Sequence, residues 1–79
     1  MNLEILSPTS SLFCGSVKAV TVPSVQGPFT MLNNHAPIVA LLQKGLIKLE
    51  TEDGDRKEFE IESGFVEQHD NEIIVCVEM

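Results

Sequence analysis

Residues 47–61, IKLETEDGDRKEFEI, contain two segments in which apolar and polar residues alternate, on either side of an Asp-Gly pair. In the first segment, Ile47 and Leu49 point one way and the residues between them point the other, and the second segment repeats the pattern. This period of two is typical of a β-strand with one buried and one solvated face. The Asp53-Gly54 pair favours a tight turn, because glycine accepts a positive φ. The stretch therefore predicts a β-hairpin.

Turn signals recur at short intervals along the rest of the chain, for example SPTSS at 7–11, QGP at 26–28 and HDN at 69–71. They separate short apolar segments, and none of these segments has a helical period over a useful length. This spacing leaves no room for βαβ crossovers. We therefore predict a single all-β domain over residues 1–79, a two-layer antiparallel β-sandwich of about ten short strands.

Two of the expected strands do not alternate. Residues 37–42, PIVALL, and 73–77, IIVCV, are apolar at every position. In a two-layer sandwich only one face of each strand meets the core, so the second face needs another cover. Another part of the chain or another protein could supply it.

The charge is divided unevenly. The net charge is −7, yet residues 50–79 hold eleven of the twelve carboxylates and residues 19–43 hold no formally charged side chain. Interface cores are depleted in charge, whereas ordinary exposed surface is not. The interval 19–43 is therefore the predicted contact surface, and the acidic balance disfavours nucleic acid as a partner.

The sequence offers no recognisable reaction centre. The two histidines are 34 positions apart and the two cysteines 62, so no close pair of zinc ligands is present. The QGPFT stretch at 26–30 lacks a phosphate-loop motif, and the serines of 7–11 lack a nucleophile elbow. The carboxylates of 50–62 alternate with apolar residues, as on a solvated strand face. We predict no catalytic, cofactor-binding or metal-binding residue.

The compartment follows from what the chain lacks. No apolar run approaches the roughly 20 residues of a membrane-spanning helix, and the N-terminus does not resemble a signal peptide. We therefore expect a cytosolic, soluble protein in which Cys14 and Cys76 are free thiols.

One corner of the uncharged interval is unusual. In NNHAP, residues 33–37, Pro37 pushes Ala36 toward an extended conformation, and the two asparagines suit a turn. The corner should be a shaped loop that leads directly into the strand 38–42. Two roles for His35 stay open: an anchor of the turn through a backbone hydrogen bond, or a contact with a partner.

Taken together, these motifs resemble the epsilon subunit of the F-type ATP synthase, specifically its N-terminal β-sandwich domain. The ordered set is LF-G at 12–15, NHAP at 34–37, KG at 44–45 and SGFVE at 63–67, and it spans nearly the whole chain. The resemblance implies a non-catalytic subunit of the rotor's central stalk. Such a subunit binds the gamma subunit and the polar loops of the c-ring, and helps couple ion translocation to ATP synthesis.

The resemblance also implies where the partners bind. We expect the contact with gamma or the c-ring to involve Gly27, Pro28, Phe29, Thr30, Met31, Leu32, Asn33, Asn34, His35, Ala36, Pro37 and Ile38. The chain would lie peripherally at the cytoplasmic face of the energy-transducing inner membrane, without inserting into it. An acidic residue that the family often carries in the loop near the c-ring is replaced here by Pro28, so shape or backbone contacts should serve instead. Cys14 and Cys76 match small residues that we expect to be buried.

Family members usually continue into a C-terminal hairpin of two helices, whereas this sequence stops at Met79. Without the hairpin, we expect neither ATP binding nor inhibition of ATP hydrolysis by that route. An alternative function from another class is a free-standing β-sandwich module that uses the 19–43 surface to bind a peptide or small ligand.

Overall fold

A computed structural model of the chain describes residues 1–33 and 36–79 and contains eight strands in that part of the sequence. The strands are β1 (Asn2–Leu6), β2 (Ser11–Val22), β3 (Phe29–Leu32), β4 (Ile38–Leu42), β5 (Gly45–Thr51), β6 (Arg56–Ile61), β7 (Ser63–His69) and β8 (Glu72–Glu78). The described residues contain no helix, so the all-β prediction is confirmed.

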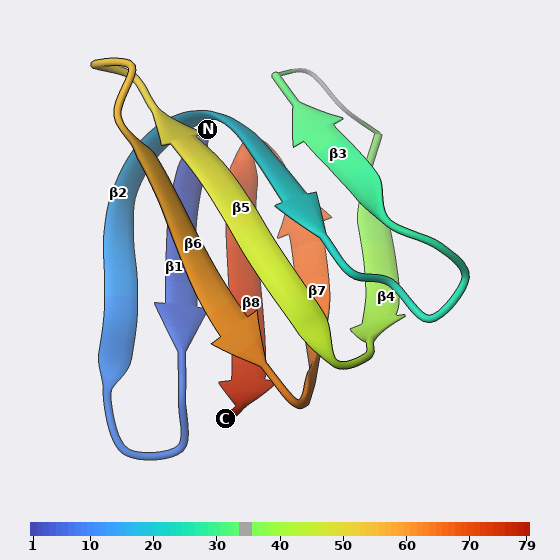
Figure 1. The fold of residues 1–79 in the computed structure, drawn as a ribbon. Helices are drawn as coiled ribbons and strands as arrows, with labels where there is room; N and C mark the ends of the chain where they lie inside the picture. Colours follow the sequence, from blue (N-terminus) through green and yellow to red (C-terminus); the bar gives the residue numbers. More distant parts are fainter. Residues whose placement is uncertain (34–35) are drawn as a thin grey trace.

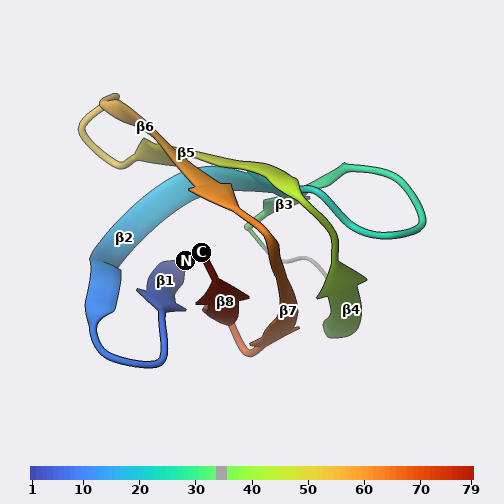
Figure 2. The same ribbon diagram turned by 60° about the horizontal axis from the view of Figure 1, so that its bottom comes forward.

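The two layers are parts of one curled sheet, in the strand order β4-β7-β8-β1-β2-β5-β6, with β3 paired to β2. Figure 1 shows the β4-β7-β8-β1 layer behind the layer formed by β3, β5 and β6, and Figure 2 shows it below that layer. The long strand β2 serves both layers: residues 11–16 pair with β1, and residues 17–22 pair with β3 and β5. The predicted count of about ten short strands was too high for the described residues, because one twelve-residue strand spans both layers.

The antiparallel prediction holds for six strand pairs, but β1 and β8 are parallel. These strands lie at opposite ends of the sequence, so no short turn has to join them. The constraint that makes hairpin partners antiparallel therefore does not apply to this pair.

The core lies between the layers and is aliphatic. Its buried members come from all eight strands, and Ile47, Leu49 and Ile61 of the predicted hairpin are among them, together with Leu3 and Ile5 of β1. Phe59, also predicted to face inward, is half-buried and packs against this cluster. Each buried Val, Leu or Ile contributes about 1.5–3 kcal/mol through removal of apolar surface from water.

Two of the predicted turns join neighbouring strands of the sheet as hairpins. In the β5–β6 turn, Gly54 has a φ of 91°, and the Thr51 N–H donates to the Asp55 carbonyl at 2.8 Å. In the β7–β8 turn, Asp70 and Asn71 have φ values of 52° and 62°. Two consecutive residues with positive φ match the right-handed twist of a two-residue hairpin loop.

The two non-alternating strands bury only one face each. In β8, Ile73, Val75 and Val77 are buried while Ile74 is exposed, and in β4, Val39 and Leu41 are exposed. No other part of the described chain covers these outward positions. The first of the two predicted covers, another part of the chain, is thus not found among the described residues.

Both cysteines are free thiols, as predicted, but Cys14 is exposed rather than buried. In the register of β1 and β2, Cys14 lies opposite Glu4, on the side of the layer that faces away from the core. The prediction of a buried Cys14 was wrong because the residue's size says nothing about the face it occupies. Cys76 is half-buried on the same side.

Gly64 provides a test of strand packing. An added Cβ there would overlap the Cys76 carbonyl oxygen and lie 3.2 Å from the Val77 Cα, so backbone would have to move. We expect Gly64→Ala to lower the free energy of unfolding by about 1–3 kcal/mol, as overpacking does. Gly15→Ala is the matched control, because its Cβ would meet only the Phe13 ring at 3.4 Å. Urea denaturation of both variants checks this, and equal losses would contradict it.

Candidate functional site

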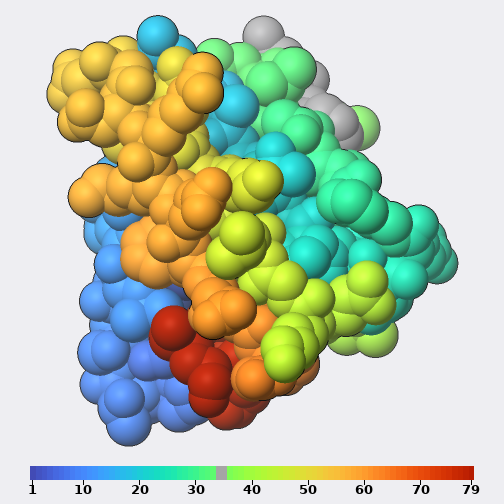
Figure 3. Space-filling model, viewed as in Figure 1, coloured from blue at the N-terminus to red at the C-terminus, as the bar shows by residue number. Residues whose placement is uncertain are grey.

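The uncharged interval 19–43 forms one side of the molecule. It comprises the end of β2, the loop to β3, β3 itself and β4, and Figure 1 places these elements together at the right of the view. Figure 3 shows the loop between β2 and β3 protruding from the same side. We call residues 19–43 the uncharged edge.

The loop of the uncharged edge is fixed by backbone hydrogen bonds. The Gly27 N–H donates to the Ser24 carbonyl at 2.9 Å, and Gly27 has a φ of 118°, which favours glycine. Two further bonds tie the loop to the neighbouring strand region: the Val25 N–H donates to the Leu41 carbonyl and the Gln43 N–H to the Pro23 carbonyl, each at 2.9 Å. The loop is therefore held in one shape against β4.

The predicted contact residues differ in exposure. The exposed ones are Pro28, Thr30, Leu32, Asn33, Ala36 and Pro37, and the half-buried ones are Gly27, Phe29 and Ile38. Met31 is fully buried opposite Val20 in the β2–β3 register, so its side chain belongs to the core and cannot reach a partner. Asn34 and His35 lie outside the described residues.

Large apolar side chains gather on the uncharged edge. Four of the eight exposed large hydrophobic residues of the described chain lie there: Val25, Leu32, Val39 and Leu41. The predicted contact set ended at Ile38 and did not include Val39 and Leu41, which are 71% and 65% exposed. The unbroken apolar run 37–42 was the signal for them, because alternate positions of a strand must point outward.

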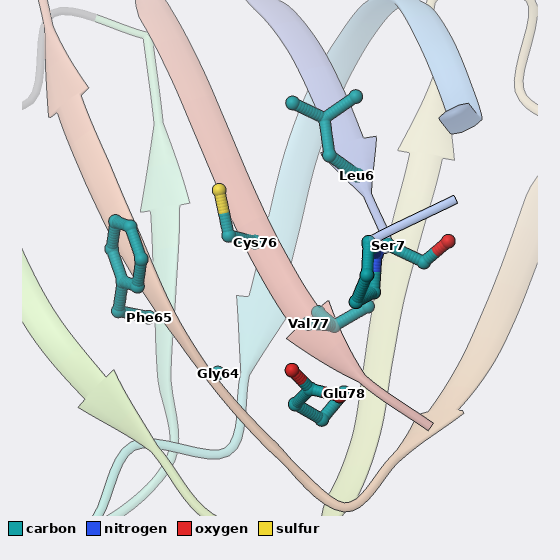
Figure 4. A pocket seen from close by; sticks show the side chains of 8 residues that line it. Leu6, Ser7, Gly64, Phe65, Cys76, Val77 and Glu78 are labelled. Carbon is teal, nitrogen blue, oxygen red and sulfur yellow. The ribbon is translucent and has the colours of Figure 1, made fainter. Parts of the chain in front are cut away.

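The apolar surface continues from β4 across the neighbouring strands. Leu41 lies opposite Phe65, Phe65 opposite Cys76, and Cys76 opposite Leu6. Directly opposed residues share a face of a sheet, so these four side chains form one row. Figure 4 shows Phe65, Cys76 and Leu6 around an open depression of about 340 Å³ that Gly64 and Val77 also line.

Among the described residues, no group of three or more His, Cys, Asp or Glu side chains is placed to hold a metal ion. The one ion pair in that part of the chain joins the neighbours His69 and Asp70 at 3.4 Å, and both side chains are exposed.

All 79 residues match the family described as the beta-sandwich domain of the ATP synthase delta/epsilon chain. The chain belongs to this family. Its relatives include the ATP synthase epsilon chain of a Nitratiruptor species, 37% identical over 78 residues, and that of Chlorobium limicola, 36% identical over 76 residues. These alignments cover 99% and 96% of this chain, and 60% and 86% of the two relatives.

Two solved ATP synthases contain chains with the same fold. One is the OSCP/F1/c-ring structure from Euglena gracilis mitochondria, with a TM-score of 0.87, 21% identity, and coverage of 98% of this chain and 49% of that one. The other is the central stalk/c-ring structure from Tetrahymena thermophila mitochondria, with a TM-score of 0.81, 20% identity, and coverage of 100% and 63%. Identities this low support the fold alone.

The family assignment confirms three predictions: the resemblance to the epsilon subunit, the β-sandwich fold class, and a subunit that is not catalytic. The chain spans about 60% of the length of the Nitratiruptor relative. Within the described residues, no helix has the length and apolar character needed to cross a membrane.

The neighbours Leu41 and Leu42 test the assignment of the outward surface. Leu42 is 4% exposed, so Leu42→Ala should lower the free energy of unfolding by about 2–5 kcal/mol through the cavity it leaves. Leu41→Ala should change it by no more than about 0.5 kcal/mol, because the side chain already faces water. Urea denaturation of both variants measures the difference, and a comparable loss for Leu41→Ala would show that its surface is covered within the chain.

Proposed function

We propose that this chain is a central-stalk subunit of an F-type ATP synthase that binds the gamma subunit and the polar loops of the c-ring. In this role it helps couple ion translocation to ATP synthesis and carries out no chemistry itself. The observation that carries the proposal is the uncharged edge, which presents exposed apolar side chains on an otherwise acidic chain.

An apolar surface that stays exposed to water has an unfavourable free energy. Single exposed apolar residues are ordinary, but contiguous ones mark interaction sites. On the uncharged edge, Val25 of the loop lies beside Val39 and Leu41 of β4 around a common depression. No charge within 19–43 would have to be desolvated when a partner covers this surface.

The uncharged edge has a fixed shape, which supports binding of one specific partner rather than of any apolar surface. Thr21 and Thr30 share a hydroxyl hydrogen bond of 2.7 Å across β2 and β3, and the loop between these strands is bonded to Leu41 and Gln43. A surface that is already ordered loses little conformational entropy on binding. The contact residues in the proposal are Gly27, Pro28, Phe29, Thr30, Leu32, Asn33, Asn34, His35, Ala36, Pro37 and Ile38, together with Val25, Val39 and Leu41.

This function sets the location of the chain. As part of the ATP synthase it lies peripherally on the membrane complex, and we propose that it faces the cytoplasm at the energy-transducing inner membrane. It is held there by its protein partners.

A pull-down of the tagged chain with purified cognate gamma tests the proposal. The unmodified chain should retain gamma, and Leu32→Asp should weaken retention at least about tenfold, because it places a charge in the contact. Leu46→Asp is the matched control: Leu46 is also exposed, at 39%, but lies outside the uncharged edge.

Each result has a clear meaning. Retention of gamma by the Leu46→Asp control and its loss with Leu32→Asp would support the proposal, provided that the urea midpoints of both variants agree. Failure of the unmodified chain to bind either gamma or the rotor complex would contradict it. A monomer with a peptide or small-molecule ligand of its own would instead identify a free-standing binding module.

A further inference from the structure

The layer β4-β7-β8-β1 has a side that faces away from the core and combines apolar residues with acidic ones. Its cross-strand register defines two neighbouring rows. The first row contains Leu41, Phe65, Cys76 and Leu6, and the second contains Val39, Glu67, Ile74 and Glu4. We call these eight residues the outer face.

The outer face is open in this structure. Val39 and Leu41 are among the most exposed large apolar side chains of the described chain, and Phe65 and Ile74 are exposed as well. They come from three neighbouring strands, so they form a contiguous patch rather than scattered residues. A patch of this kind is typical of a protein interaction site.

The two glutamates give the outer face a charge pattern. Glu67 on β7 and Glu4 on β1 lie in one row with Ile74 of β8 between them. Two strand spacings separate their backbones, a distance of about 10 Å. Within the described residues, neither side chain has a hydrogen-bond or ion-pair partner.

The cations of the chain lie elsewhere. Four of the five Lys and Arg residues are on β2, β5 and β6, and the fifth, Lys44, is in the turn between β4 and β5. None of them belongs to the outer face. A partner that covered this face without supplying positive charge would leave two carboxylates buried and unpaired, which is strongly destabilising.

We propose that the outer face docks a segment of a neighbouring rotor protein that presents apolar side chains beside two Lys or Arg residues about 10 Å apart, the spacing of two strands. The apolar side chains cover the first row, and the two cations pair with Glu67 and Glu4. This inference rests on the proposed function, because it assigns the chemistry of a second part of the rotor contact.

Other occupants fit the outer face less well. A second copy of the chain would place an identical face, with the same apolar residues and carboxylates, against this one. Neither copy would supply a cation to pair with the glutamates. An anionic membrane surface would be repelled by the same two glutamates. A basic, apolar protein segment satisfies both features of the face.

Charge reversal at Glu67 tests the proposal in the assembled enzyme. Binding of the chain would be measured by titrating the fluorescently labelled chain against the cognate ATP synthase from which this subunit has been removed. Glu67→Lys should weaken binding by about tenfold or more, because it turns an attractive pair into a repulsive one. The matched control is Glu60→Lys, which makes the same charge change on β6, away from the outer face.

A second variant tests the apolar row independently of charge. Phe65→Ser should weaken binding at least about tenfold, because Phe65 is 44% exposed, lies outside the uncharged edge, and aromatic anchors dominate such contacts. The urea midpoint of each variant shows whether the domain remains folded. Binding of the unmodified chain should also weaken as salt rises, and Glu67→Gln should show a smaller salt dependence.

The outcomes separate this inference from the proposed function. If the unmodified chain fails to bind the depleted enzyme, the proposed function fails and this inference fails with it. If the unmodified chain binds but folded Glu67→Lys and Phe65→Ser bind equally well, the inference is overturned and the proposed function stands. Equal weakening by Glu67→Lys and Glu60→Lys would also overturn it, because only the net charge would then matter.

Discussion

The sandwich depends on one strand that takes part in both layers. The first half of β2 pairs with β1, and the second half pairs with β3 and β5, so a single segment carries backbone hydrogen bonds from one layer to the other. The register shifts between Val17 and Ala19, where β2 passes from one layer to the next. Such an irregularity bends a strand and increases its twist, which allows the sheet to curl around its own core.

The curled sheet then decides which residues face solvent. Each strand offers alternate side chains to the single core, and in β4 and β8 the remaining side chains are apolar as well. In a chain this small, the core between the two layers is the only place where the described residues bury large apolar side chains. The second apolar side of these strands therefore stays exposed in the described chain.

The charged side chains are also distributed unevenly over the strands. The acidic half of the chain supplies solvated glutamates on β6, β7 and β8, whereas the uncharged edge carries none. Glu67 differs from the other glutamates of these strands, because β7 places it among apolar residues of the outer face. Its apolar neighbour Ile74 is on the next strand, β8, whereas Val39 comes from β4, which is distant in sequence.

The sequence by itself determined the strand character, the hairpin turns, the family and the position of the uncharged interval, because period-two alternation, turn residues and motif order are local properties. Only the tertiary structure decided that β1 pairs in parallel with β8, that Cys14 is exposed and Met31 buried, and that Leu41, Phe65, Cys76 and Leu6 form one row. These facts depend on which strands become neighbours and in which register. Residues far apart in sequence become paired because all the strands enclose one common core. No single segment of the sequence specifies that arrangement.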